Sequence, residues 1–182
     1  MNVTLTILEF HIPALFRKKI LRELFSATAQ AFGVDPPPGK GLSAGRLLQA
    51  YADFTREQSE KLWKENRDQG EVERKLFQNA MELGAALRQR LRVRSREEVI
   101  RASRVLYRVL GIAFEGRLDG RVIIRDCYFS RFYTSRVCRL VSALDAGAAA
   151  GISGGGKLEF SQRMTEGHDS CRASLVFEDG PS

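Results

Sequence analysis

The 182-residue chain lacks several features that would assign it to a large class of proteins. It has no uncharged apolar run of the ~18–20 residues that crossing a bilayer requires. Its N-terminal apolar residues precede the first basic ones, and no small-residue cleavage site follows, which is the reverse of a secretory signal. Cysteine is scarce and odd in number, at Cys127, Cys138 and Cys171, so a disulfide framework is not expected. These absences predict a cytoplasmic protein with free thiols.

Positive charge is present in excess and is unevenly distributed. The net charge is +7, and between Arg88 and Arg139 fourteen arginines accompany only five acidic residues. Such a segment can bind nucleic acid or another anionic partner, or can serve as a scaffold surface. It can equally be the solvated face of amphipathic helices. No recognised nucleic-acid-binding motif accompanies the charge, so we do not expect nucleic acid to be the partner.

The first 112 residues carry mainly helical periodicity. Residues 3–10 alternate weakly and predict a short strand or an extended arm. Apolar residues then recur at three- and four-residue intervals, and the spacing predicts helices over 13–32, 43–66, 71–91 and 95–110. Residues 35–41, rich in proline and glycine, form the connector between the first two helices. Ser95 and Glu98 form a capping box at the start of the fourth helix.

After Gly111 the apolar period changes from that of a helix to that of a strand. We expect a hairpin over 112–129, a helix from Ser130 to about Leu144, a loose small-residue segment over 146–156, and a second hairpin over 157–177. The predicted fold class is α+β: an N-terminal bundle of about four helices, then a small four-stranded antiparallel sheet built as hairpin, helix and hairpin. We interpret 1–182 as a single domain, with a helical part at 1–112 and a ligand-binding ββαββ part at 113–178.

Specific residues in the C-terminal third resemble two related protein families. They are the strand end Asp126–Ser130, the pair Val137-Cys138, Gly147 and Gly151, and the hairpin Leu158-x-Phe160…Gly167-x-x-x-Cys171-x-x-x-Leu-Val-Phe177. This order resembles the vinyl-4-reductase small-molecule-binding domain and the L-2-aminothiazoline-4-carboxylic acid hydrolase-like family. Both are similar to the superfamily that includes haem nitric-oxide-binding and Golgi transport-particle folds. The chain departs from the first pattern at Met164, where a cysteine is usual, and from the second at Tyr128, where proline is usual.

The resemblance implies that three thiols and one imidazole converge. Cys127, Cys138, His168 and Cys171 then form a Cys3His set, which suits zinc. Alternatively, Cys127 or Cys138 is a catalytic nucleophile with His168 as its base. Asp126, Asp145 or Asp169 would then supply the orienting carboxylate. The simplest alternative is that the cysteines are small buried hydrophobic residues and that His168 is an exposed turn residue.

Arginines and aromatic residues beside the predicted sheet are candidates for ligand binding. Arg125 and Arg163 are suited to holding a carboxylate in bidentate fashion, and strict alternation places Arg125 on the same strand face as Cys127. The alternative is that these arginines form ion pairs, for example with Glu159 or Asp126. Aromatic side chains would supply an apolar pocket between the sheet and the helices, chiefly Phe129, Phe132 and Tyr133.

Together these observations predict a domain that binds a small, partly apolar acid between its sheet and its helices. A hydrolase of a small heterocyclic carboxylate, acting through a cysteine or a metal-bound water, is the first alternative. A basic nucleic-acid-binding or scaffold protein is the second. The resemblance also implies a homodimer that pairs through the N-terminal helices, although helices 13–32 and 43–66 fit an intramolecular bundle equally well.

Overall fold

The computed structural model describes residues 2–37 and 41–177 and has the α+β architecture that the sequence predicts. Part of the predicted connector, 38–40, and the ends of the predicted domain, 1 and 178–182, lie outside the described residues. The helices are α1 (Val3–Phe10), α2 (Ala14–Phe32), α3 (Ala44–Lys64), α4 (Gln69–Arg90), α5 (Arg96–Val109) and α6 (Ser135–Ser153). The strands are β1 (Ile112–Gly116), β2 (Arg121–Cys127), β3 (Lys157–Gln162) and β4 (Cys171–Val176), with 3-10 turns η1 (Tyr128–Arg131) and η2 (Met164–Glu166).

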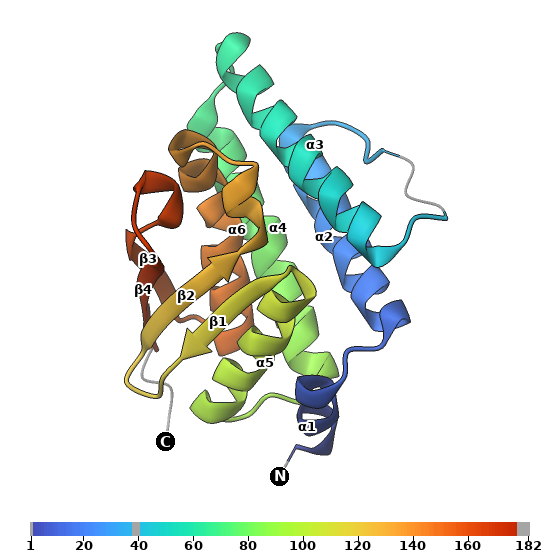
Figure 1. The fold of residues 1–182 in the computed structure, drawn as a ribbon, viewed down its shortest axis with the longest axis vertical. Helices are drawn as coiled ribbons and strands as arrows, with labels where there is room; N and C mark the ends of the chain where they lie inside the picture. The colour runs from blue at the N-terminus through green and yellow to red at the C-terminus, as the bar shows by residue number, and fades with distance from the viewer. Residues whose placement is uncertain (1, 38–40, 178–182) are drawn as a thin grey trace.

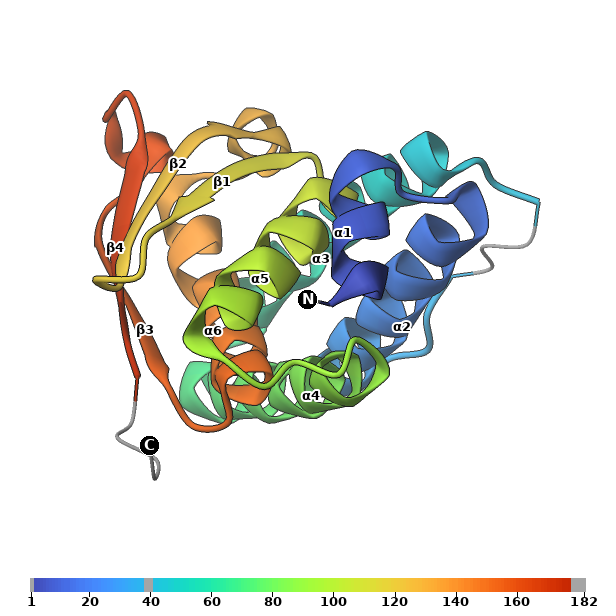
Figure 2. The same cartoon turned by 90° about the horizontal axis from the view of Figure 1, so that it is seen from below.

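The sheet covers one side of the helices. Its four strands are antiparallel in the order β1-β2-β4-β3, so the two hairpins join through β2 and β4. α6 packs between the sheet and α4, while α2 and α3 lie on the far side (Figure 1). Seen from below, α5 lies next to the sheet, and α1 lies beside α5 (Figure 2). The sheet is therefore backed by helices on one face only.

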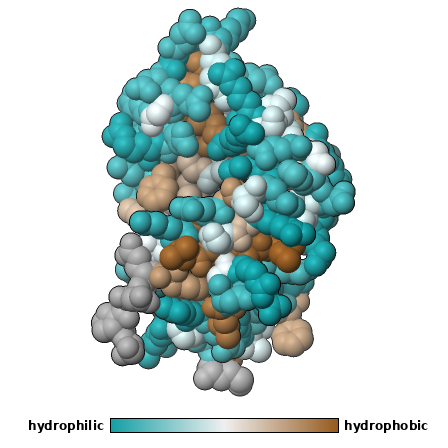
Figure 3. Space-filling model, turned by 90° about the vertical axis from the view of Figure 1, so that its left-hand side faces the viewer, coloured by the Kyte–Doolittle hydropathy of each residue, from teal (hydrophilic) through white to brown (hydrophobic). Residues whose placement is uncertain are grey.

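The outer face of the molecule on the sheet side is mostly hydrophilic, with hydrophobic residues gathered in a few patches (Figure 3). The inner face supplies core residues instead: Val122, Ile124, Leu158, Ala173 and Leu175 are all buried. Such alternation is typical of an antiparallel sheet with one solvated face. Among the described residues, no helix has both the length and the apolar run needed to cross a membrane.

The prediction of a strand or extended arm over residues 3–10 is wrong, because this segment is helix α1. The Asn2 side chain accepts a hydrogen bond from the Leu5 N–H (3.2 Å) and caps the helix. The same side chain donates to the Leu91 carbonyl (2.6 Å) after α4. Leu5 and Leu8, three residues apart, are buried, so the tertiary contacts favour the helical period over alternation.

The predicted loose segment at 146–156 is also wrong over most of its length, because α6 continues to Ser153. A methyl group added to Gly147 would overlap the carbonyl of Phe77 on α4, and one added to Gly151 would overlap the carbonyl of Met81. The small residues therefore let the two helix backbones touch. The helix begins one turn later than expected: its N-cap is Thr134, while Ser130 lies in η1.

Two bulges interrupt the sheet. In the first, Ala113 pairs with Asp126 but Phe114 pairs with Ile124, so Arg125 is an extra residue in β2. In the second, Ser161 is an extra residue in β3. Each bulge changes which side chains face the helices beyond that point. This shift decides the composition of the site described below.

Candidate functional site

A cavity of about 100 Å³ lies between the sheet and the helices. Residues from α2, α3, α5, α6 and all four strands or their ends contribute to its walls. Most are apolar, such as Leu106, Leu110, Ile112, Ile124 and Val141. The polar minority consists of Tyr51, Tyr107, Tyr133, Ser142, Asp145, Arg163 and the three cysteines. A mostly apolar hollow with a few convergent polar groups is the usual form of a small-molecule site.

Asp145 is the buried acid of this cavity. It projects from α6, and its Oδ1 accepts a hydrogen bond from the Tyr107 hydroxyl of α5 (2.9 Å). Within the described part of the chain, no hydrogen bond reaches its second carboxylate oxygen. Burial raises the pKa of Asp145 from 3.8 to about 6, although the Tyr107 hydrogen bond and the charge of Arg163 both act to lower it. The unused oxygen is therefore available to a donor inside the cavity.

Arg163 is the cation of the cavity and follows β3. Its Nε donates to Ser142 Oγ on α6 (3.3 Å), and its guanidinium lies over the Phe160 ring, 5.0 Å from the centroid. Its Nη1 is 3.8 Å from a Glu166 carboxylate oxygen, and 18% of the side chain is exposed. The guanidinium thus lies at the edge of the cavity, where part of the side chain is exposed to solvent. Its weak ion pair leaves much of its donor capacity for a ligand.

All three cysteines line the cavity. Burial raises the pKa of each thiol, that of Cys127 to about 12, and the nearby Asp145 carboxylate raises each further. The Cys171 sulfur accepts a hydrogen bond from the Met164 N–H (3.4 Å), and the Cys138 thiol contacts the Thr165 side chain. These thiols are protonated near neutral pH and are poor nucleophiles.

The predicted partner of the thiols, His168, lies elsewhere. It is exposed on the turn between η2 and β4 and is not part of the cavity wall. No group of three or more His, Cys, Asp or Glu residues in 2–37 and 41–177 is placed to hold a metal ion. The predicted zinc set of Cys127, Cys138, His168 and Cys171 is therefore not assembled, and His168 is not positioned as a base for Cys127 or Cys138. The turn chemistry of residues 166–170 accounts for this placement.

The predicted ligand contacts separate into two groups. Phe129 and Tyr133 line the cavity with stacked rings, 5.3 Å between centroids, and Arg163 joins them. Arg125 does not, because it follows the buried Ile124 in the strand and therefore faces outward, where its Nε pairs with Glu115 (2.8 Å). Phe132 packs against Tyr128 outside the cavity wall.

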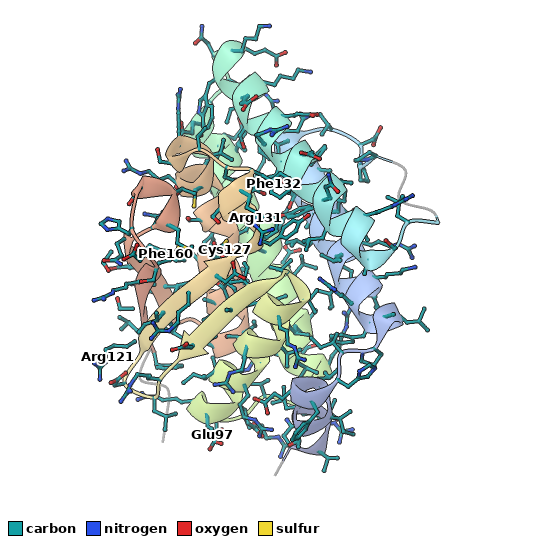
Figure 4. All side chains as sticks on the ribbon, in the orientation of Figure 1. Glu97, Arg121, Cys127, Arg131, Phe132 and Phe160 are labelled. Carbon is teal, nitrogen blue, oxygen red and sulfur yellow. The ribbon has the colours of Figure 1, made fainter. Side chains whose placement is uncertain are left out.

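The bulge at Arg125 brings Cys127 into the site and separates it from Arg125, with which strict alternation had grouped it. Because one residue is extra, Cys127 returns to the same face as Ile124, and both contribute to the cavity. Cys127 ends β2 near the centre of the molecule, and Phe160 lies on β3; Arg121 lies at the far end of β2 (Figure 4). Strict alternation would have placed Cys127 beside Arg125 and away from Ile124.

Sequence analysis missed Tyr107 and Ser142 and gave Asp145 only a secondary role. A signal for Asp145 was present: it lies on the helix face of Cys138, Val141 and Ser142, at spacings of three and four residues. An acid within an apolar stripe must be buried with a partner or must serve a function. Tyr107 gave no such signal, since a tyrosine on the apolar face of a helix is usually an ordinary core residue.

Most arginines of the basic segment from Arg88 to Arg139 have partners within the molecule. At least seven of its arginines form ion pairs: Arg90, Arg101, Arg104, Arg117, Arg121, Arg125 and Arg139. Two more are engaged differently, since Arg88 donates to the Ile152 carbonyl (2.8 Å) and Arg136 stacks on Trp63. Most of this charge is used within the molecule, which favours the reading of a solvated helix face.

Comparison with known proteins does not indicate a function, so the geometry of the cavity is the basis for the proposal below. The chain matches no protein-family profile. It also matches no curated protein sequence. The resemblance to the vinyl-4-reductase and aminothiazoline-carboxylate hydrolase families therefore stays a prediction.

Proposed function

We propose that the protein binds a small ring compound bearing a carboxylate and an N–H group, held between the sheet and the helices. The observation that carries the proposal is one cavity that contains both a buried acid, Asp145, and a partly buried arginine, Arg163, within apolar walls. Asp145 has no ion pair within the described residues, which is costly in these surroundings, and Arg163 has donors left beyond its weak pair with Glu166, so a ligand that bonds to both groups is favoured. This extends the small, partly apolar acid expected from the sequence.

The size of the cavity limits the ligand. An apolar protein cavity of about 150 Å³ accommodates benzene. At about 100 Å³, the present cavity fits a five-membered ring more closely than a larger one. Phe129 and Tyr133 offer stacked aromatic walls, and Leu106, Leu110 and Ile124 offer aliphatic ones. Flat heterocycles therefore match the walls better than branched aliphatic acids.

The two polar groups define how the ring would lie. The carboxylate would bond to Arg163, whose guanidinium is near the solvent side and already oriented by Ser142 and Phe160. The N–H group would bond to the second oxygen of Asp145, whose first oxygen is held by Tyr107. Asp145 and Arg163 are each held by a hydrogen bond to a neighbouring side chain, so ligand binding would cost little side-chain conformational entropy.

Pyrrole-2-carboxylate is a direct probe of this arrangement, because it is a five-membered ring with one N–H and one carboxylate. We expect it to raise the melting temperature and to shift the NMR signals of Phe129 and Tyr133. Cyclopentanecarboxylate, which lacks the N–H group, should bind at least about tenfold more weakly, because Asp145 is left unpaired.

Two arginine variants provide a matched comparison. Arg163→Met should abolish the effect of pyrrole-2-carboxylate, whereas Arg125→Met should leave it unchanged, since Arg125 is exposed and paired with Glu115. Equal losses in the two variants would contradict the proposed site. So would equal binding of the pyrrole and cyclopentane acids to the unmodified protein.

A further inference from the structure

A second feature, remote from the cavity, is an unpartnered apolar face at the N-terminal end. Val3, Ile7 and Phe10 recur at four- and three-residue intervals and share one face of α1, while Leu5 and Leu8 on the opposite face are buried. All three outward residues are exposed, and Leu15 at the start of α2 is exposed as well. Phe10 and Leu15 are 82% and 84% exposed. We define Val3, Ile7, Phe10 and Leu15 as the N-terminal apolar face.

The N-terminal apolar face holds four of the seven large hydrophobic side chains that are exposed among the described residues. Phe10 and Leu15 flank the short connection 11–13 between α1 and α2. α1 lies at the lower end of the molecule in Figure 1 and leads into α2, and seen from below the two helices lie near each other (Figure 2). Isolated exposed hydrophobic residues are ordinary, but a cluster of this kind marks an interaction surface.

Free positive charge borders this face. Lys19 and Arg22 follow Leu15 at four and seven residues and so share the outward face of α2, and Lys18 lies next to them. None of the ion pairs found among residues 2–37 and 41–177 involves Lys18, Lys19 or Arg22. Lys19 and Arg22 are exposed and Lys18 is partly exposed, so these charges face solvent.

The acidic residues of the same two helices are already neutralised. Glu9 forms ion pairs with Arg101 (2.8 Å) and Arg104 (2.9 Å), and Glu23 pairs with Arg90 (2.8 Å). The surface that surrounds the apolar face is therefore cationic. A symmetric contact with a second copy of the chain would bring like charges together, which opposes that contact.

We propose that the N-terminal apolar face docks on the surface of a bilayer that contains anionic phospholipid. Exposed aromatic and leucine side chains beside lysine and arginine are the combination that interfacial binding requires. The apolar residues enter the boundary between headgroups and acyl chains, and Lys18, Lys19 and Arg22 remain at the level of the headgroups. The cavity, which opens beside Arg163, takes no part in this contact.

Co-sedimentation with vesicles tests the proposal. The purified protein is mixed with vesicles of phosphatidylcholine alone or with about 30% phosphatidylserine, at about 0.1 M salt. Three cations at roughly fivefold each predict binding on the order of 100-fold stronger to the anionic vesicles. The variant Phe10→Ser/Leu15→Ser should bind those vesicles at least about tenfold more weakly.

The matched control is Leu118→Ser/Val176→Ser, which removes two exposed hydrophobic residues at the sheet and should bind as the unmodified protein does. Equal loss in both double variants, equal binding to the two vesicle compositions, or no binding at all would overturn the proposal. Sedimentation velocity supplies a further check. A dimer that Phe10→Ser/Leu15→Ser converts to monomer would show that a second copy of the chain occupies this face instead.

Discussion

The buried carboxyl of Asp145 makes a specific dependence of stability on pH testable. Its pKa is about 6 in the folded protein. The ordinary value of an aspartate side chain, 3.8, applies to the unfolded chain. Between these values the folded protein holds a proton that the unfolded chain has released. Stability must therefore fall as pH rises from about 4 to above 6, because the folded state alone bears the cost of an ionised buried group.

The magnitude follows from the size of the pKa difference. A pKa difference of about 2.2 corresponds to about 3 kcal/mol of lost stability at pH 8, at about 1.4 kcal/mol for each unit. At pH 4.5 only about 1 kcal/mol of this cost is present, because the unfolded carboxyl is then partly protonated. Asp145 is half-buried, so solvent screening reduces these values somewhat.

The variant Asp145→Asn isolates this effect. It keeps an oxygen acceptor for the Tyr107 hydroxyl but cannot ionise. Urea unfolding of both proteins at pH 4.5 and pH 8 should show the variant gaining about 2 kcal/mol on the unmodified protein between the two values. The difference between the free energies of unfolding of the two proteins cancels the contributions of other carboxylates. Asp119 and Glu166 are examples: arginines lower their pKa values, so their contributions change with pH in the opposite direction.

Glu159→Gln, at an exposed carboxylate on β3, is the control and should show no such gain. A free-energy difference between Asp145→Asn and the unmodified protein that is the same at pH 4.5 and pH 8 would refute the reasoning. It would mean that Asp145 is hydrated, and the cavity would then not be the apolar site proposed above.

Two further predictions concern the helix contact and the thiols. Gly147→Ala should lower the free energy of unfolding by about 3 kcal/mol or more in urea titrations, because its methyl group would overlap an α4 carbonyl. Gly45→Ala on α3 has open space and should instead raise it by up to about 1 kcal/mol; equal effects of the two changes would contradict the backbone contact. A thiol-specific disulfide reagent at pH 8 should modify Cys127 roughly 1000-fold more slowly in the folded protein than in urea, since its pKa rises from 9.0 to about 12. A fast folded-state reaction at Cys127 would restore the nucleophile hypothesis.

Helix periods and strand periods in the sequence were sufficient to predict most of the fold. The four long helices and both hairpins occur where the apolar spacing places them, and Ser95 caps α5 by accepting from the Glu98 N–H (3.2 Å). Glu98 departs from the capping-box expectation in one detail, since its carboxylate accepts from the Arg94 N–H (2.7 Å). The single-domain boundaries and the homodimer stay predictions.

The failures arise where distant contacts override local pattern. Residues 146–153 are glycine- and alanine-rich, a composition typical of a loop, but contact with α4 makes them helical. Residues 3–10 alternate weakly, but Leu5 and Leu8 fit a helical groove. At the site, the three cysteines and Arg163 line one cavity, while the roles expected of them stay predictions. Arg125 lies outside that cavity, because the bulge moves Cys127 to the face of Ile124 while Arg125 stays on the opposite face, and a bulge leaves no mark in the sequence pattern.

The direct contact of α6 on α4 gives the cavity one stiff wall and one adaptable wall. One wall is α6, which carries the cavity residues Cys138, Ser142 and Asp145. The small residues of α6 bring its backbone into contact with the backbone of α4, and this contact fixes the positions of the three side chains. The opposite wall belongs to strands that already carry two bulges, and a sheet absorbs small changes of curvature at such points. Changes in ligand preference during evolution should therefore accumulate on the strands, while the Gly147 and Gly151 positions remain small.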